Sequence, residues 1–219
     1  MRNLNPLKAE CRISRFHDEK GNFVDSTCLV NALPAFATAL LKRLFGYRPK
    51  VPMISFRARR VIATMLGPQS KMIEFGSGNS TPWFAAHAGM IVSIEDDSNW
   101  YDHVQKLLTE LDIKNVKHKL RTKINYSDLS EIDDATLDFA LVDGTDREGC
   151  IRSVVPKLKP GAFLYLDNSD KDMTFPNGDL RRAEKALLEA IEIRGGTVQY
   201  FSDFSPTNFF VEQGMLAQL

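Results

Sequence analysis

Four acidic residues follow short apolar runs in this chain, at positions where buried strands would end. They are Glu74, Glu95, Asp143 and Asp167. Carboxylates placed in this way can accept hydrogen bonds from ligand hydroxyls, face a cation, or take a proton from a reacting group. Any one of them could instead cap a helix or form a turn. Their recurrence at the ends of apolar runs favours a shared ligand site.

The first acid precedes a glycine turn, and a helix is expected to begin at Thr81-Pro82. Gly76 and Gly78 permit a tight turn and a close ligand approach, and the helix start offers unpaired N–H groups. A dinucleotide fingerprint needs a glycine at position 81, which is Thr here, and the Gly-Lys-Ser/Thr of a phosphate loop never occurs. Glu74 beside the turn favours a cationic or hydroxyl-rich ligand over a diphosphate.

Glu95 lies 17 residues after Gly78. An acid at this point can accept both hydroxyls of a ribose. The spacing is shared with dinucleotide-binding proteins, so a nicotinamide-dependent oxidoreductase remains an alternative. Glu74 and Thr81 disfavour it.

The elements that must hold these residues alternate between strands and helices from Lys71 onward. Strands are predicted at 72–75, 90–95, 116–120, 137–142, 162–166, 197–201 and 208–212, and helices at 82–88, 99–111 and 180–194 and around Ile151 to Leu158. Such alternation predicts an α/β fold, an open and mostly parallel sheet with helices on both faces. Ligands bind such sheets at the carboxyl ends of the strands, where the four acids are expected.

The N-terminal part, residues 1–52, is expected to form an arm and a helical cover for a domain at 53–219. Residues 1 to about 27 show no periodicity, a regular helix is predicted from Pro34 to just before Gly46, and a second helix at 54–66. Apolar side chains at helical spacing indicate a face that covers the domain; they are Leu29, Leu33, Phe36, Leu40 and Leu44. A membrane-surface helix is the less favoured alternative, since only two basic residues flank it. The helix could equally cover a neighbour in a homodimer.

Composition limits the partners. Lys+Arg and Asp+Glu both number 28 and no polybasic block stands out, so we expect no nucleic acid partner. Three widely spaced cysteines favour a reducing compartment. The first residues lack the apolar core of a signal peptide, and the apolar stretch from Cys28 to Leu41 is short for a bilayer span. A cytoplasmic protein without a membrane partner is expected.

Taken together, these motifs resemble the class I S-adenosylmethionine (SAM)-dependent methyltransferases. The resemblance rests on Glu74-x-Gly76-x-Gly78, Glu95, Asp143 and the run Leu158 to Ala162, and it covers residues 53–219. The longer runs 73–84 and 142–147 are similar to a bacterial small-molecule branch of that family. The resemblance implies a Rossmann-like seven-stranded sheet whose last strand is antiparallel.

The resemblance also implies roles for individual residues. Asn125 or Asp128 would contact adenine, and Asp143 and Asp167 would be catalytic. The implied cofactor-binding set is Glu74, Phe75, Gly76, Ser77, Gly78, Ser80, Thr81, Glu95, Asp96 and Asp143. The expected reaction is O-methylation of a small molecule or sugar-like acceptor.

Two alternatives remain beside that reaction. A catechol-type enzyme would hold Mg²⁺ through Asp143, Asp167 and Asn168, and oxygen ligands suit that ion. That group usually follows the Asp-Asn pair with apolar and aromatic residues, whereas Ser169-Asp170-Lys171-Asp172 follow here. The other alternative is a non-catalytic module that binds the cofactor in the same fold.

Overall fold

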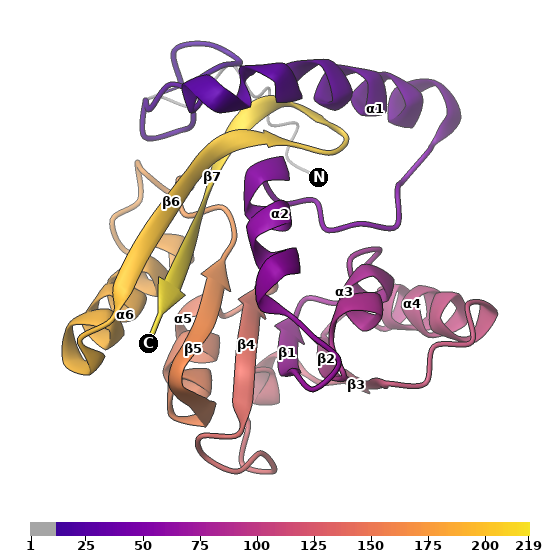
Figure 1. The fold of residues 1–219 in the computed structure, drawn as a ribbon, viewed down its shortest axis with the longest axis vertical. Coiled ribbons are helices and arrows are strands. Elements are labelled where there is room, and N and C mark those ends of the chain that lie inside the picture. Colours follow the sequence, from indigo (N-terminus) through magenta and orange to yellow (C-terminus); the bar gives the residue numbers. More distant parts are fainter. Residues whose placement is uncertain (1–11) are drawn as a thin grey trace.

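The computed structural model describes residues 12–219. Their centre is a seven-stranded sheet of order β3-β2-β1-β4-β5-β7-β6 (Figure 1). The strands are β1 (Lys71–Phe75), β2 (Met90–Glu95), β3 (Val116–Leu120), β4 (Leu137–Val142), β5 (Leu158–Leu166), β6 (Thr197–Ser205) and β7 (Asn208–Gln218). Strands β3 to β5 of this order pair in parallel, and β7 runs antiparallel to both neighbours. The predicted α/β fold, with its Rossmann-like and mostly parallel sheet, is confirmed.

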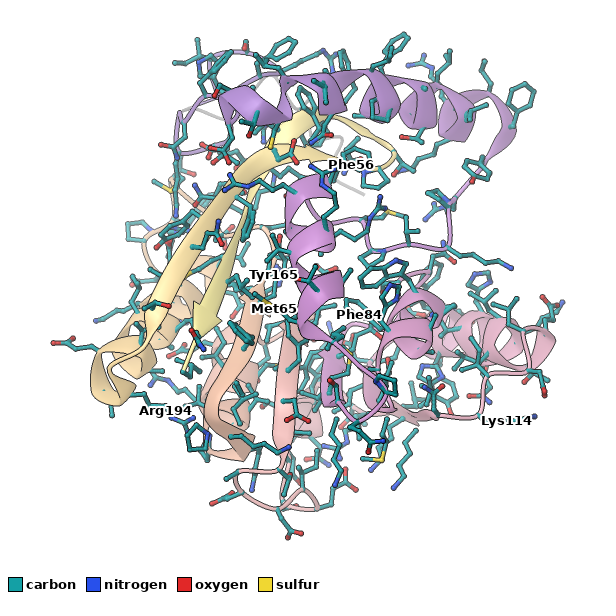
Figure 2. The ribbon with its side chains drawn as sticks, in the orientation of Figure 1. Phe56, Met65, Phe84, Lys114, Tyr165 and Arg194 are labelled. Atoms are coloured by element: carbon teal, nitrogen blue, oxygen red, sulfur yellow. The ribbon has the colours of Figure 1, made fainter. Side chains whose placement is uncertain are left out.

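Helices cover both faces of the sheet. One apolar cluster joins α2 (Phe56–Met65) and α3 (Thr81–His87) to the sheet, and another joins α5 (Arg147–Val154) and α6 (Asp179–Arg194) to its other face. Side-chain alternation along β1 explains the two layers, because Met72 belongs to the first cluster and Ile73 and Phe75 to the second. Figure 2 shows Met65, Phe84 and Tyr165 in the first layer. Helix α4 (Ser98–Glu110) packs beside β2 and β3.

The hairpin of β6 and β7 is longer than predicted. Its strands pair from Thr197 with Gln218 as far as Ser205 with Asn208, beyond the expected ends at 201 and 212. The added length buries Phe204 and Val211 against the N-terminal part of the chain. The hairpin therefore carries this N-terminal part beyond the end of the parallel strands, as Figure 1 shows.

The N-terminal cover begins with a 3₁₀ turn, η1 (Ser26–Asn31), and continues directly into α1 (Ala32–Phe45). The helix thus starts two residues before the predicted Pro34 and ends as expected at Gly46, whose φ of 66° suits glycine. Residues 12–25 contain an isolated bridge between His17 and Phe23. The rest of the predicted irregular arm, residues 1–11, lies outside the described residues.

The prediction for the covering face of this helix is wrong. The side chains expected to pack on the domain, such as Leu33 and Leu44, are exposed, and Cys28 and Ala35 are buried in their place. Periodicity identified residues that share a face but not the direction in which that face points. Small and polar side chains fit closely over the hairpin, and Phe36 contacts Phe209 of β7 with ring centroids 5.3 Å apart, whereas the other large apolar side chains point outward.

Candidate functional site

A cavity of about 450 Å³ opens at the carboxyl ends of β1, β2 and β4. Strand order reverses between β1 and β4, which is where open parallel sheets bind their ligands. The wall combines the loops after these strands with residues from the N-terminal cover. It is formed by Arg48, Pro52, Met53, Ile54, Gly76, Ser77, Gly78, Asn79, Ser80, Glu95, Asp96, Trp100, Tyr126, Leu141, Asp143, Gly144 and Thr145.

The loop after β1 approaches the loop after β4 closely. Gly76 has a φ of 94°, and a Cβ at this position would lie 2.9 Å from the backbone nitrogen of Gly144. Both its conformation and its surroundings therefore require glycine. Gly78 has no such requirement, because a Cβ there would make its nearest contact at 3.6 Å, to Ser80 Oγ.

Glu74 lies beneath this loop and does not reach the cavity wall. Its side chain points to the α3 side of the sheet, where it accepts hydrogen bonds from Ser80 Oγ at 2.6 Å, Thr81 Oγ1 at 2.7 Å and Ser93 Oγ at 2.7 Å. Ser93 is its neighbour in the register of β1 and β2. Burial raises the pKa of Glu74 to about 7, although the three hydroxyl donors oppose that rise. Glu74 thus fixes the loop and the start of α3.

Glu95 lies at the end of β2, on the cavity wall. One carboxylate oxygen accepts the backbone N–H groups of Asp96 at 3.0 Å and Asp97 at 3.1 Å, and the other accepts Ser77 Oγ at 3.1 Å. These bonds fix the carboxylate plane while the group remains part of the cavity wall. Burial raises its pKa, and the bonds to Asp97 and Ser77 oppose that rise.

His118 supports the same region from β3. Its Nε2 lies 3.0 Å from Ser77 Oγ, and its ring stacks on Tyr101 with centroids 4.2 Å apart. Burial lowers its pKa to about 4, so the ring is neutral at physiological pH. The sequence indicates no partner for this histidine. Ser77 lies on the loop after β1, and His118 lies on β3, 41 residues further along the chain. His118 is a support for Ser77.

Two aromatic side chains complete the cavity wall. Trp100 donates from Nε1 to the Ser77 carbonyl at 2.7 Å. The Tyr126 hydroxyl is buried and has no hydrogen-bond partner among the described residues. The residues expected beside adenine, Asn125 and Asp128, are exposed and do not line the cavity. Tyr126, from the same segment, is the residue that borders the cavity, because the turn after β3 directs its ring inward.

Asp143 and Asp167, at the ends of β4 and β5, form a pair of interacting carboxyl groups. The Asp143 side chain is 39 % exposed to the cavity, whereas Asp167 is buried. Partial loss of hydration beside the surrounding protein raises the pKa of Asp143, burial raises that of Asp167, and the charge of Asp143 raises that of Asp167 further. Arg147 opposes the shift, with Nη2 3.1 Å from Asp143 Oδ1. A carboxyl group with a raised pKa in a cavity suits proton transfer near neutral pH.

The structure does not support the alternative with a Mg²⁺ site at Asp143, Asp167 and Asn168. The Asn168 amide donates to Glu212 at 3.4 Å, and the Arg147 guanidinium already provides the cation beside Asp143. Arg147 also donates to the Asp167 carbonyl at 2.6 Å, so it binds both strand ends. Across residues 12–219, no group of three or more His, Cys, Asp or Glu side chains could hold a metal ion.

The residues expected to bind the cofactor thus divide into two groups. Gly76, Ser77, Gly78, Ser80, Glu95, Asp96 and Asp143 line the cavity. Glu74, Phe75 and Thr81 are fully buried behind it, Phe75 in the apolar core and the other two beneath the loop. Asp167 lies behind Asp143.

Several residues of the wall were not foreseen from the sequence. Arg48 and Pro52 come from the N-terminal cover, and Met53 and Ile54 follow directly at the start of the domain. The only sequence signal for these residues is a proline-containing linker just before the domain. That signal does not indicate that the linker folds over the strand ends. Gly144 and Thr145 follow Asp143 directly, and Thr145 Oγ1 donates to Asp96 Oδ2 at 3.2 Å.

Comparison with known proteins identifies the fold. No family model and no curated protein matches the chain. Among solved structures, cofactor-bound Rv0187 from MTB matches with a TM-score of 0.61 and 19% identity, over 89% of this chain and 90% of that one. A SAM-dependent O-methyltransferase from Thermotoga maritima matches with a TM-score of 0.54 and 18% identity, over 83% and 70%. An rRNA methylase from Streptococcus thermophilus matches with a TM-score of 0.54 and 18% identity, over 77% and 99%. The chain therefore has the class I SAM-dependent methyltransferase fold.

Proposed function

We propose that this protein is a SAM-dependent methyltransferase that acts on a hydroxyl group of a small molecule. The observation that carries the proposal is the convergence of the glycine loop, Glu95 and Asp143 on one cavity at the strand-order switch. The shared fold supports it, because its members include SAM-dependent enzymes such as the Thermotoga maritima O-methyltransferase. The cavity has the size of a small-molecule site.

The donor set of the cavity fits SAM. Glu95 is held with its carboxylate on the wall, where it can accept the two ribose hydroxyls. Trp100 offers a ring to a base, and Tyr126 closes the wall behind the cavity from the apolar core. Acidic groups around the cavity, Asp96 and Asp143 among them, favour a sulfonium cation and an amino group. We infer that the loop from Gly76 to Ser80 holds the amino-acid end.

Asp143 is the group that we assign to the reaction. When bound, SAM would supply an electrophilic methyl group: the acceptor oxygen would bond to the methyl carbon in line as the carbon–sulfur bond breaks, and the neutral thioether product would leave. Asp143, in its ionised form, takes the proton of the acceptor hydroxyl. Arg147 and Asp167 hold the Asp143 carboxyl in place and set its pKa. No metal ion is needed for these roles.

The proposal also names the class of acceptor, a hydroxyl group of a small molecule. Structures that share the fold include both an O-methyltransferase and an rRNA methylase. The acid pair at Asp143 and Asp167 favours a hydroxyl acceptor, because a base assists an alcohol more than it assists an amine that is already neutral. The cavity volume favours a small molecule, or one group of a larger one.

A calorimetric titration of the protein with SAM and with its demethylated product tests the proposal. We expect both to bind, and Glu95→Ala to weaken binding by about 10- to 100-fold, since hydrogen bonds to a charged group contribute roughly 1.5–3 kcal/mol. Asp128→Ala is the matched control, because Asp128 is an exposed acid outside the cavity. Absence of binding, or a bound nicotinamide dinucleotide, would overturn the proposal. Binding without turnover on any hydroxyl acceptor would leave the non-catalytic alternative.

A further inference from the structure

The outer face of the N-terminal cover is made of large apolar side chains. Val30, Leu33 and Phe45 are 73%, 75% and 76% exposed. We call this surface the outer face; it comprises Leu29, Val30, Leu33, Phe36, Leu40, Leu41, Leu44, Phe45 and Tyr47. Figure 2 shows side chains of α1 that project away from the sheet. A continuous apolar surface of this kind marks an interaction site.

The inner side of the same helix is polar and is bonded to the hairpin of β6 and β7. Asn31 donates to both carboxylate oxygens of the buried Asp203, at 3.0 and 2.9 Å. Thr38 Oγ1 accepts the backbone N–H of Thr207 at 2.9 Å, and Lys42 donates to Thr207 Oγ1 at 3.3 Å. These bonds fix the rotation of the helix, so the apolar side chains are held outward.

The sequence around this helix contains no acid. From Ser26 to Ile73 the chain has no Asp or Glu, and its charged residues are Lys42, Arg43, Arg48, Lys50, Arg57, Arg59, Arg60 and Lys71. The formal charge of the whole chain is nevertheless zero, because acidic residues outnumber basic residues after residue 73. Four of the basic residues lie at or just after the end of α1. The outer face is therefore bordered by positive charge.

We propose that the outer face docks on an anionic phospholipid bilayer, with the helix lying in the plane of the membrane surface. An apolar helix face beside basic side chains is the pattern of interfacial helices. Each basic residue near an anionic surface adds about 1 kcal/mol of attraction. Arg43 and Lys50 form no ion pair among the described residues, so they are available to lipid phosphates.

The helix lies on the membrane and does not cross it. The helical segment Ser26–Phe45 has 20 residues and a mean hydropathy of 1.4, so its length and composition alone would permit a span. A spanning position would separate the helix from the hairpin and break the bonds of Asn31 to the buried Asp203.

A second copy of this chain and an RNA fit the outer face less well. In a parallel pair of α1 helices Arg43 would meet its equivalent, and in an antiparallel pair it would meet a first turn that has no acid. Neither arrangement offers a partner charge. An RNA partner would need exposed basic and polar side chains at the centre of the surface, where Leu33, Phe36 and Leu40 lie instead.

The outer face is continuous with the candidate site along the chain. The linker that leaves α1 at Gly46 reaches Ile54 within a few residues and supplies Arg48, Pro52 and Met53 to the cavity wall. Docking of α1 therefore brings the cavity close to the bilayer surface. The docking proposal stands on the helix alone and does not depend on methyl transfer.

Sedimentation of the full chain with lipid vesicles tests the proposal. The vesicles are phosphatidylcholine alone, or phosphatidylcholine with about one quarter phosphatidylglycerol, an anionic lipid. We expect binding to the anionic vesicles, with weaker binding to the neutral ones and a decrease as salt rises. The double variant Leu33→Glu/Phe45→Glu should weaken binding by about tenfold or more, since it removes two apolar anchors. Arg43→Glu/Lys50→Glu should weaken it and flatten its salt dependence.

Ile193→Glu is the matched control. Ile193 is 85% exposed and lies on α6, a helix that Figure 1 shows apart from α1, so its replacement should leave vesicle binding unchanged. Circular dichroism and SAM titration establish that each variant is folded. The proposal fails if wild type ignores anionic vesicles, or if the control loses as much binding as the double variant. It also fails if the double variant instead splits a dimer in solution, or if the wild type binds tRNA but no vesicles.

Discussion

The Thr81 hydroxyl donates a hydrogen bond to Glu74 Oε2 at 2.7 Å and accepts one from the backbone N–H of Gly78 at 3.0 Å. One side chain thus joins the acid at the end of β1 to the loop that follows it. Glu74 and Thr81, the two residues by which this loop differs from a dinucleotide fingerprint, are therefore hydrogen-bonded to each other. A glycine at position 81 could make neither bond, so Glu74 would lose a donor.

Thr81→Val tests this connection. The variant keeps the shape of the side chain but leaves the buried Glu74 oxygen and the Gly78 N–H each short of one hydrogen bond. We expect a loss of about 1–3 kcal/mol in the free energy of unfolding, measured in urea as a lower midpoint with an unchanged slope. Thr81→Ser keeps the hydroxyl and should lose much less. Equal losses in the two variants would show that packing, and not the hydroxyl, matters.

Glu74→Gln should change how stability depends on pH. Burial raises the pKa of Glu74 to about 7 from an ordinary value of 4.5. Folding therefore gains most from this group below about pH 4.5, and the gain is lost as pH rises to about 7. The total is roughly 3 kcal/mol, since one pKa unit corresponds to about 1.4 kcal/mol.

Glutamine does not titrate, so the variant should lack this component. The measurement is chemical denaturation at several pH values, with the difference between wild type and variant plotted against pH. Relative to wild type, Glu74→Gln should gain stability between about pH 4.5 and 7, and the difference should stay constant above that range. A difference that is flat across this range would contradict the raised pKa.

Sequence reasoning predicted the sheet because each strand is a short apolar run that ends at an acid or a turn. Its errors have physical causes. Side-chain alternation directs Glu74 towards α3, whereas its position beside the turn suggested the ligand. The direction of Tyr126 depends on a short 3₁₀ turn at Lys123–Asn125, for which the sequence has no period. The outward face of α1 depends on the bonds of Asn31 to Asp203, residues far apart along the chain.

Asp143→Asn tests the role of the acid pair in the proposed reaction. The amide keeps the shape of the side chain and cannot take a proton, so we expect turnover on a hydroxyl acceptor to fall by about 10²–10⁴-fold. Because the pKa of Asp143 is raised by partial loss of hydration, wild-type activity should increase with pH as the carboxyl ionises, and the variant should lose that increase. Asp128→Asn is the control. Full turnover in Asp143→Asn would show that Asp143 takes no part in the reaction. SAM binding is tested separately by the titration.

Gly144 and Tyr126 should be coupled in both stability and SAM binding. A methyl group at position 144 would overlap the Tyr126 hydroxyl and lie 2.8 Å from its ring carbon Cζ. Gly144→Ala should therefore displace the ring from the cavity wall, lower stability and weaken SAM binding. Tyr126→Phe removes a buried hydroxyl that has no partner among the described residues, so it should cost little stability.

The double variant Gly144→Ala/Tyr126→Phe should recover part of the loss, because removal of the hydroxyl relieves the worst overlap. Recovery should be partial, since the methyl group would still crowd the ring carbon. We expect a coupling of about 1 kcal/mol or more in a double-mutant cycle measured by urea denaturation. Gly78→Ala is the matched control in the same wall, where a methyl group fits at ordinary distances. Strict additivity of the two changes would show that the loop after β4 moves freely, and Tyr126 would then not be a fixed wall of the site.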